Sequence, residues 1–66
     1  MDFSEKLVCL RTNREFTQEA VAHGAGISLR AYQNYEHRLR EPKLTALIAL
    51  ANFYDITLDE LVCRER

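Results

Sequence analysis

One short segment of the chain carries polar side chains of the types and spacing that bind nucleic-acid bases. On a helix that advances about 100° per residue, the side opposite Tyr32 carries Arg30, Gln33, Asn34 and His37. Arg can bind guanine through two hydrogen bonds in the major groove, and Gln or Asn can bind adenine in the same way. The segment therefore predicts a base-binding face, and its alternative interpretation is an ordinary solvated helix face.

Positive charge is concentrated around the same segment. The 66 residues include nine Lys and Arg and ten Asp and Glu, which gives a formal charge of −1. Residues 28–43 nevertheless hold four basic and two acidic side chains, whereas residues 1–27 sum to −1 and residues 44–66 sum to −2. Phosphate contacts need local cations rather than a basic whole protein. This distribution favours a nucleic-acid backbone as the partner of the segment.

Catalytic and metal sites are poorly supported by the sequence. A catalytic site needs a nucleophile or acid–base group with an orienting partner, and the only histidines, His23 and His37, have no Asp or Ser at a matching spacing. A metal site built from these histidines with Cys9 and Cys63 lacks a closely spaced pair of ligands. We expect no enzyme activity, no metal, no cofactor and no small-molecule ligand.

Size and composition predict one small soluble domain. With 47% apolar and 29% charged residues, the chain can form a core and is unlike a disordered segment. The charged N-terminus is unlike a signal peptide, and the longest uncharged run, residues 44–54, is too short for a bilayer span of ~20 residues. The two cysteines lie near opposite ends of the chain and form no disulfide framework. We expect a reduced, cytoplasmic protein with no membrane partner.

Cap and breaker residues divide the first half of the chain into three helices. Asp2 caps the first, which is expected to end near residue 13. Thr17 caps a second helix, and residues 23–26 are expected to break it because glycine enters left-handed backbone freely. Ser28 then caps a third helix. A turn of three or four residues containing glycine between two helices is the helix-turn-helix spacing.

Two further helices follow in the second half. The third helix is expected to end near Glu36, ahead of Pro42, which disfavours helix before it. An apolar stripe predicts a fourth helix over residues 44–54, and Thr57 with Glu60 forms a capping box that opens a short last helix. The expected fold is an all-α, compact five-helix domain without strands.

The order of motifs along the chain extends this interpretation. The motifs are Leu10-Arg11, Phe16-Thr17-Gln18-Glu19, Val21-Ala22, Gly26-Ile27-Ser28, Tyr32, Tyr35-Glu36, Pro42, Leu47-Ile48-Ala49-Leu50-Ala51 and Ile56-Thr57-Leu58-Asp59-Glu60-Leu61. Together they resemble the lambda-repressor/Cro type of helix-turn-helix protein, the Xre family. The resemblance implies one DNA-binding domain over residues 1–66, which binds a palindromic double-stranded operator as a homodimer and regulates bacterial or phage transcription, most simply as a repressor.

The resemblance also implies roles for individual residues. The residues that would enter the major groove and contact bases are Ser28, Leu29, Arg30, Gln33 and Asn34. The residues that would contact phosphates are Gln18, Arg38, Arg40 and Lys43. Arg11 and Glu36 match a family ion pair that links the first helix to the third, which makes them structural rather than catalytic.

Three positions depart from the family pattern. Arg38 stands where the family commonly has Gly, and a left-handed backbone there would cost about 1 kcal/mol. The small pair Gly24-Ala25 replaces bulkier residues and is expected to loosen the end of the second helix. Lys43 stands where the family often has Ser, and its side chain cannot cap the fourth helix.

The C-terminal segment is rich in apolar residues for so small a chain. These are Ile56, Leu58, Leu61, Val62 and Cys63. A short last helix cannot bury all of them, so they predict a homodimer interface. Two-fold pairing would set the two third helices about one DNA turn apart, roughly 34 Å. The alternative is that these residues complete the core of a monomer.

One rival function shares the expected fold. A helical protein-binding module, such as an antitoxin-like or regulator-binding partner, has the same architecture, so the fold alone does not choose between the two functions. Salt-sensitive binding to duplex DNA of random sequence would discriminate between them.

Overall fold

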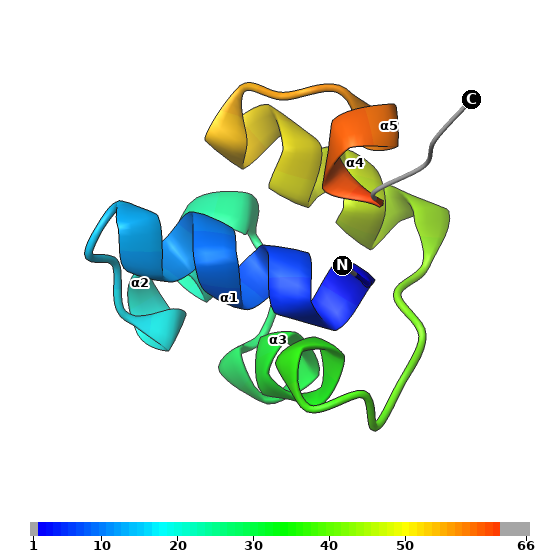
Figure 1. Ribbon diagram of the computed structural model, residues 1–66. Helices are drawn as coiled ribbons and strands as arrows, with labels where there is room; N and C mark the ends of the chain where they lie inside the picture. The colour runs from blue at the N-terminus through cyan, green and yellow to red at the C-terminus, as the bar shows by residue number, and fades with distance from the viewer. Residues whose placement is uncertain (1, 63–66) are drawn as a thin grey trace.

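The chain folds into helices joined by short loops. The computed structural model describes residues 2–62. Within them it forms α1 (Phe3–Asn13), α2 (Gln18–Ala25), α3 (Leu29–Glu36), α4 (Leu44–Tyr54) and α5 (Leu58–Leu61) (Figure 1). The predicted all-α, five-helix fold is confirmed over these residues. None of the described helices is both long and apolar enough to span a lipid bilayer.

Side-chain caps start four of the five helices. The side chains of Asp2, Thr17 and Ser28 each accept a hydrogen bond from the backbone N–H three residues further on, at 2.9, 3.0 and 3.1 Å. Thr57 forms the reciprocal capping box predicted for α5. Lys43, at the start of α4, makes no side-chain cap, as expected. A cap of this kind stabilises a helix by about 1 kcal/mol, so the sequence positions of these residues determine where the helices begin.

The predicted break in α2 is placed too early. The helix continues through Ala25, and Gly26 ends it with a left-handed backbone at φ 72°. Gly24 lies inside the helix, and a Cβ there would come within 2.1 Å of the Phe53 ring. The absent side chain therefore makes room for an aromatic ring from α4. Phe53 thus packs into the space where the sequence analysis expected the small pair to loosen α2.

The core lies where the five helices meet. α1 packs against α3 and α5, while α2 packs against α3 and α4 (Figure 1). The buried apolar residues are Leu7, Val21, Ala22, Tyr32, Tyr35, Ala46, Leu50, Ala51, Tyr54 and Leu61. Ser4 is also buried, and its hydroxyl donates a 2.7 Å hydrogen bond to the Tyr35 carbonyl. This bond ties the first turn of α1 to the end of α3, which fixes the orientation of α3 in the domain.

The second residue of the loop between α3 and α4 has a strained backbone. Arg38 has a left-handed backbone, with φ at 61°. A side chain at such a position costs about 1 kcal/mol relative to glycine. The backbone at Arg38 is therefore left-handed although the residue is not glycine.

Candidate nucleic-acid interface

The two sides of α3 differ as the helical spacing predicted. Tyr32 is 0% exposed and Tyr35 is 7% exposed, so both belong to the core. Arg30 is exposed on the opposite side, with Gln33 and Asn34 half-buried. The N-terminal end of this face carries Ser28 and Leu29. The polar face is thus free to meet a partner, and the five predicted base-binding residues lie on one helix and its cap.

Lys43 lies beside the start of α3 although fifteen residues separate it from Ser28 in the sequence. It lines a shallow groove together with Gly26, Ser28 and Ala31. The loop between α3 and α4 therefore returns a cation to the helix-turn-helix corner. A lysine in this position can contact a phosphate that flanks a base bound by α3.

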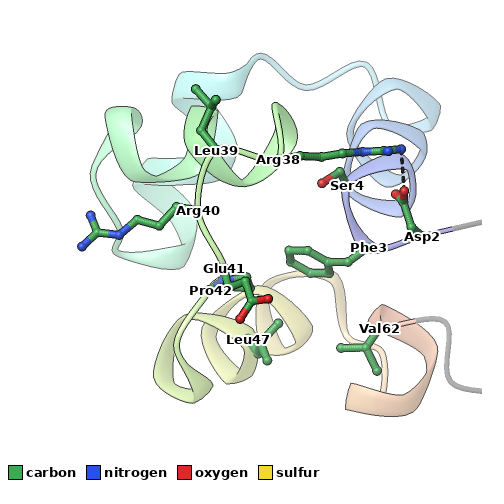
Figure 2. Close-up of a pocket in the computed structure, with 10 residues that line it drawn as sticks. All are labelled: Asp2, Phe3, Ser4, Arg38, Leu39, Arg40, Glu41, Pro42, Leu47 and Val62. Atoms are coloured by element: carbon green, nitrogen blue, oxygen red, sulfur yellow. Dashed lines mark ion pairs between the residues drawn. The ribbon is translucent and has the colours of Figure 1, made fainter.

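Arg38 and Arg40 extend in different directions from the same loop. The Arg38 guanidinium forms an ion pair with Asp2 and lies 3.4 Å from a carboxylate oxygen of Glu5, both near the start of α1. Arg40 instead extends away from α1 (Figure 2). The structure thus separates two residues that the sequence analysis grouped as phosphate contacts. Arg38 links the loop to α1 in the free protein, so we leave it out of the proposed phosphate contacts.

An ion pair between Arg11 and Glu36 joins α1 to α3. Arg11 Nε donates to Glu36 Oε2 at 2.8 Å, and Nη2 donates to Oε1 at 3.3 Å. The Glu36 side chain is 4% exposed and the Arg11 side chain 19%. Arg11 Nη1 also donates to the Phe16 carbonyl at 3.2 Å, which holds the loop before α2. The pair is shielded and lies behind the polar face rather than on it.

Two more donors reach the Glu36 carboxylate. The Tyr32 hydroxyl donates to Oε2, and Gln18 Nε2 donates to Oε1 at 3.0 Å. Burial raises the pKa of Glu36, but the hydrogen bonds from Arg11, Tyr32 and Gln18 outweigh it and hold the pKa below its ordinary value. Burial, followed by the bond to Glu36, raises the pKa of Tyr32. Glu36 is therefore a buried carboxylate that only accepts hydrogen bonds.

Tyr54 brings a hydroxyl group into the core without a hydrogen bond. Its ring packs edge-on against Phe53 at a centroid distance of 5.0 Å, and the Arg14 guanidinium carbon lies 5.3 Å from its ring centroid. The hydroxyl is buried and has no hydrogen-bond partner within residues 2–62. Burial raises the pKa of Tyr54 to about 12. The ring of Tyr54 therefore contributes packing to the core.

Gln18 is occupied by protein groups on both sides of its amide. Besides donating to Glu36, it accepts a 3.1 Å hydrogen bond from Gln33 Nε2 at its own Oε1. The sequence analysis assigned Gln18 to a phosphate and Gln33 to a base without connecting them. Fifteen residues separate the two side chains, and no local pattern in the sequence signals such a contact. Packing of α2 against α3 brings them together.

The predicted dimer residues divide into two groups. Leu61 is 0% exposed, so its assignment to the interface was wrong. Ile56 packs against the core and is only partly exposed. Leu61 is buried because α5 packs on α1 and α4, which cover its inward side. Leu58 is 37% exposed and Val62 is half-buried. Cys63 lies outside the described residues.

Apolar exposure on α4 was not anticipated from the sequence. Leu44 is 63% exposed and Ile48 is 41% exposed, one turn apart on the same face. Leu47, on the same helix, lines an open groove of about 600 Å³ with Phe3 and Val62 (Figure 2). The sequence analysis used this stripe only to predict the helix. An apolar stripe stays partly exposed when it is wider than the area that the neighbouring helices cover.

The chain matches a known protein family over most of its length. A helix-turn-helix family model matches residues 10–61, a range that runs from the end of α1 to the end of α5. The chain belongs to the helix-turn-helix family. The resemblance to its lambda-repressor, or Xre, branch inferred from the sequence is thereby confirmed. Within residues 2–62, no group of three His, Cys, Asp or Glu side chains could hold a metal ion.

Characterised helix-turn-helix relatives are transcriptional regulators. The chain is 42% identical over 60 residues to the cryptic phage CTXphi transcriptional repressor RstR of Vibrio cholerae, covering 91% of this chain and 54% of the relative. It is 35% identical over 65 residues to the transcriptional activator BcrR of Enterococcus faecalis, covering 98% of this chain and 32% of the relative. The chain thus spans about half or less of the length of these relatives.

Solved helix-turn-helix structures superimpose closely on the fold. The restriction-modification controller protein C.AhdI of Aeromonas hydrophila matches with a TM-score of 0.84 and 30% identity, over 89% of both chains. A transcriptional regulator from Listeria innocua matches with a TM-score of 0.86 and 25% identity, over 97% of this chain and 60% of that one. The arrangement of α2 and α3 is therefore that of known regulators.

Proposed function

We propose that residues 1–66 act as one DNA-binding domain that regulates transcription in the cytoplasm by placing α3 in the major groove. The observation that carries this proposal is the polar face of α3, which has Lys43 beside the turn that precedes the helix and Arg40 in the loop that follows it. Ser28, Leu29, Arg30, Gln33 and Asn34 contact base edges. Gln18, Arg40 and Lys43 contact phosphates, which position the helix without reading sequence.

The groups on α3 suit direct readout of sequence. The Arg30 guanidinium can donate two hydrogen bonds to guanine, and the Asn34 amide can pair with adenine. Leu29 offers an apolar surface that can pack against a thymine methyl group. Repression is the simplest consequence, because a protein bound to an operator that overlaps a promoter excludes polymerase.

We infer that the protein binds a palindromic operator as a homodimer. Its support is the exposure of Leu44 and Ile48 on α4 and of Leu58 on α5, two helices that pack together, with Val62 half-buried after α5. A second copy related by a two-fold axis would cover this surface on both chains, since a two-fold interface uses the same patch twice. The two copies of α3 would then lie roughly 34 Å apart, one turn of DNA.

Selection from a random duplex pool tests DNA binding. We expect an enriched palindromic site, and weaker salt-sensitive binding to unrelated duplex. Arg30→Ala is expected to weaken binding to the selected site by about 1–3 kcal/mol and to relax preference at one base position. Lys43→Ala is expected to weaken all sequences alike and to reduce the salt slope by about one unit. Lys6→Ala, which removes a cation from α1, is the charge-matched control.

One result would overturn the DNA proposal, and another would overturn only the role given to Arg30. Absence of binding to any duplex at low salt would favour the rival role as a protein-binding module. An unchanged site preference in Arg30→Ala, with uniform loss of affinity, would reassign Arg30 to a phosphate.

Sedimentation tests the dimer. We expect the wild type to associate at micromolar concentration, and Ile48→Glu to shift it to a 7.7 kDa monomer that remains folded. Leu61→Glu is unsuitable because Leu61 is buried in the monomer and the change would unfold it. A wild type that stays monomeric even with its selected DNA would refute the dimer.

A further inference from the structure

A continuous series of hydrogen bonds runs from the buried ion pair to the polar face of α3. Glu36 Oε1 accepts from Gln18 Nε2 at 3.0 Å, and Gln18 Oε1 accepts from Gln33 Nε2 at 3.1 Å. Glu36 lies on the α3 face that packs inward, and Gln33 lies on the face that points away from the core. The first group in the series is a 4% exposed carboxylate, and the last is an amide at the proposed DNA surface.

The chemistry of Glu36 determines which way each amide points. An ionised carboxylate has no proton to donate, so Gln18 must turn its NH2 group toward Glu36. The Gln18 carbonyl oxygen then faces Gln33, and Gln33 must turn its own NH2 group toward that oxygen. Reversing either amide would bring two acceptors together. The orientation of Gln33 is therefore imposed by a residue that is itself buried.

Gln33 keeps hydrogen-bonding groups available once this orientation is set. Its NH2 group has a second hydrogen, and its Oε1 accepts no hydrogen bond within residues 2–62. An amide that offers one acceptor and one donor side by side matches adenine, whose major-groove edge has the N6 donor and the N7 acceptor. It does not match guanine, whose O6 and N7 are both acceptors.

We propose that Gln33 specifies adenine in the bound DNA, and that Gln18 and Glu36 are positioning residues that hold its amide in the orientation adenine requires. The proposal rests on the DNA-binding function proposed above and assigns a base to one position of the site. Because Gln18 takes one of the two NH2 hydrogens, Gln33 keeps a single free donor beside its acceptor and cannot donate to both O6 and N7 of guanine.

The same series connects a phosphate contact to base recognition. Gln18 Nε2 has one hydrogen besides the one it donates to Glu36, and that hydrogen can meet a phosphate oxygen at the start of α2. A phosphate would add a third contact to a Gln18 that Glu36 and Gln33 already hold in the free protein. Loss of Gln18 would then affect the choice of base as well as overall affinity.

The test compares base preference among matched variants. Gln33→Ala first identifies the base pair that Gln33 reads, as the position at which the selected site loses its preference. Gln18→Met then keeps the length of the side chain and removes its amide. We expect the preference for adenine over guanine at that same position to fall at least about fivefold, which corresponds to the lower end of the discrimination of one two-bond contact. Asn34→Ala, on the same helix face, is the control and should change a different position.

Each outcome separates this inference from the function on which it rests. If Gln18→Met weakens all sequences equally and leaves the preference at the Gln33 position intact, Gln18 contacts a phosphate only and the inference is overturned. The inference is also overturned if the base pair that Gln33 reads carries guanine, or if Gln33→Ala selects the same DNA sequence as the wild type. In those three cases the wild type still selects a site, whereas failure of the wild type to select any site refutes DNA recognition itself. The melting temperature of Gln18→Met, if close to that of the wild type, excludes unfolding as the cause.

Discussion

Replacing Glu36 by Gln leaves the Arg11 guanidinium without its charge partner in a site where 19% of the arginine side chain is exposed. The substituted amide can accept from one side only, so donors from Arg11, Tyr32 or Gln18 lose an acceptor. Breaking a buried pair in this way typically costs 3–5 kcal/mol, against 0–1 for a surface pair. The partial exposure of Arg11 places Glu36→Gln near the lower end, about 3 kcal/mol.

That loss is large for a domain of this size. A 66-residue domain is stabilised by roughly 3–10 kcal/mol in total. Each kcal/mol moves the midpoint of thermal unfolding by about 4–8 °C in small domains, so Glu36→Gln should lower Tm by about 12–24 °C. Urea unfolding and thermal melting at one fixed protein concentration would measure it, because association makes stability depend on concentration. Glu41→Gln, in the exposed loop, is the matched control and should change stability by less than about 0.5 kcal/mol.

The same pair makes stability depend on pH in a defined direction. The folded-state pKa of Glu36 lies below its ordinary value, because hydrogen bonds outweigh the effect of burial. The unfolded chain therefore takes up the proton first as pH falls, and the stabilisation is complete above about pH 4.3 and is lost as pH falls through the folded pKa. The difference between wild type and Glu36→Gln should be largest near neutral pH and should shrink in acid. Equal stability of the two proteins at pH 7, or a difference that grows in acid, would refute the reasoning.

Five further substitutions, at four positions, test three other features of the fold by urea unfolding. Gly24→Ala should lower the stability by about 1–3 kcal/mol despite the better helix propensity of Ala, because the added methyl group overlaps the Phe53 ring. A variant more stable than the wild type would show that the ring moves aside freely. Tyr54→Phe removes a buried hydroxyl that has no partner in residues 2–62 and should leave the stability unchanged or raise it. Tyr32→Phe removes a hydrogen-bond donor to the buried Glu36 carboxylate and should cost about 1–3 kcal/mol of stability. An equal loss of stability in the two variants would contradict this contrast. Arg38→Gly should be more stable than Arg38→Ala by about 1 kcal/mol. Both variants lose the ion pairs of Arg38, but only glycine relieves the strain of the left-handed backbone. Equal stability of the two variants would show that the backbone at this position is not strained.

The sequence by itself determined the features that depend on near neighbours. Asp2, Thr17, Ser28 and Thr57 each cap a helix through a backbone N–H three residues away, so their effect is local and visible in the order of residues. Gly26 ends α2 because it enters the left-handed region without a Cβ, which is again a property of one residue. The inward side of α3 follows from the helical repeat. For these reasons the helix-turn-helix unit and the direction of its polar face could be predicted.

Only the tertiary structure decided which distant residues meet. Gly24 resembles a helix breaker in the sequence, yet it is helical because Phe53, from α4, occupies the space beside it. In the sequence Leu61 resembles an interface residue, but α1 and α4 cover it. Arg38 resembles its loop neighbours, but in the structure it pairs with Asp2, the cap of α1. The angle and distance between packed helices set these contacts, and neither is encoded in the spacing of residues along one helix. The orientation of the amide that faces DNA depends on such a contact, since Glu36 reaches Gln33 only through a glutamine on another helix.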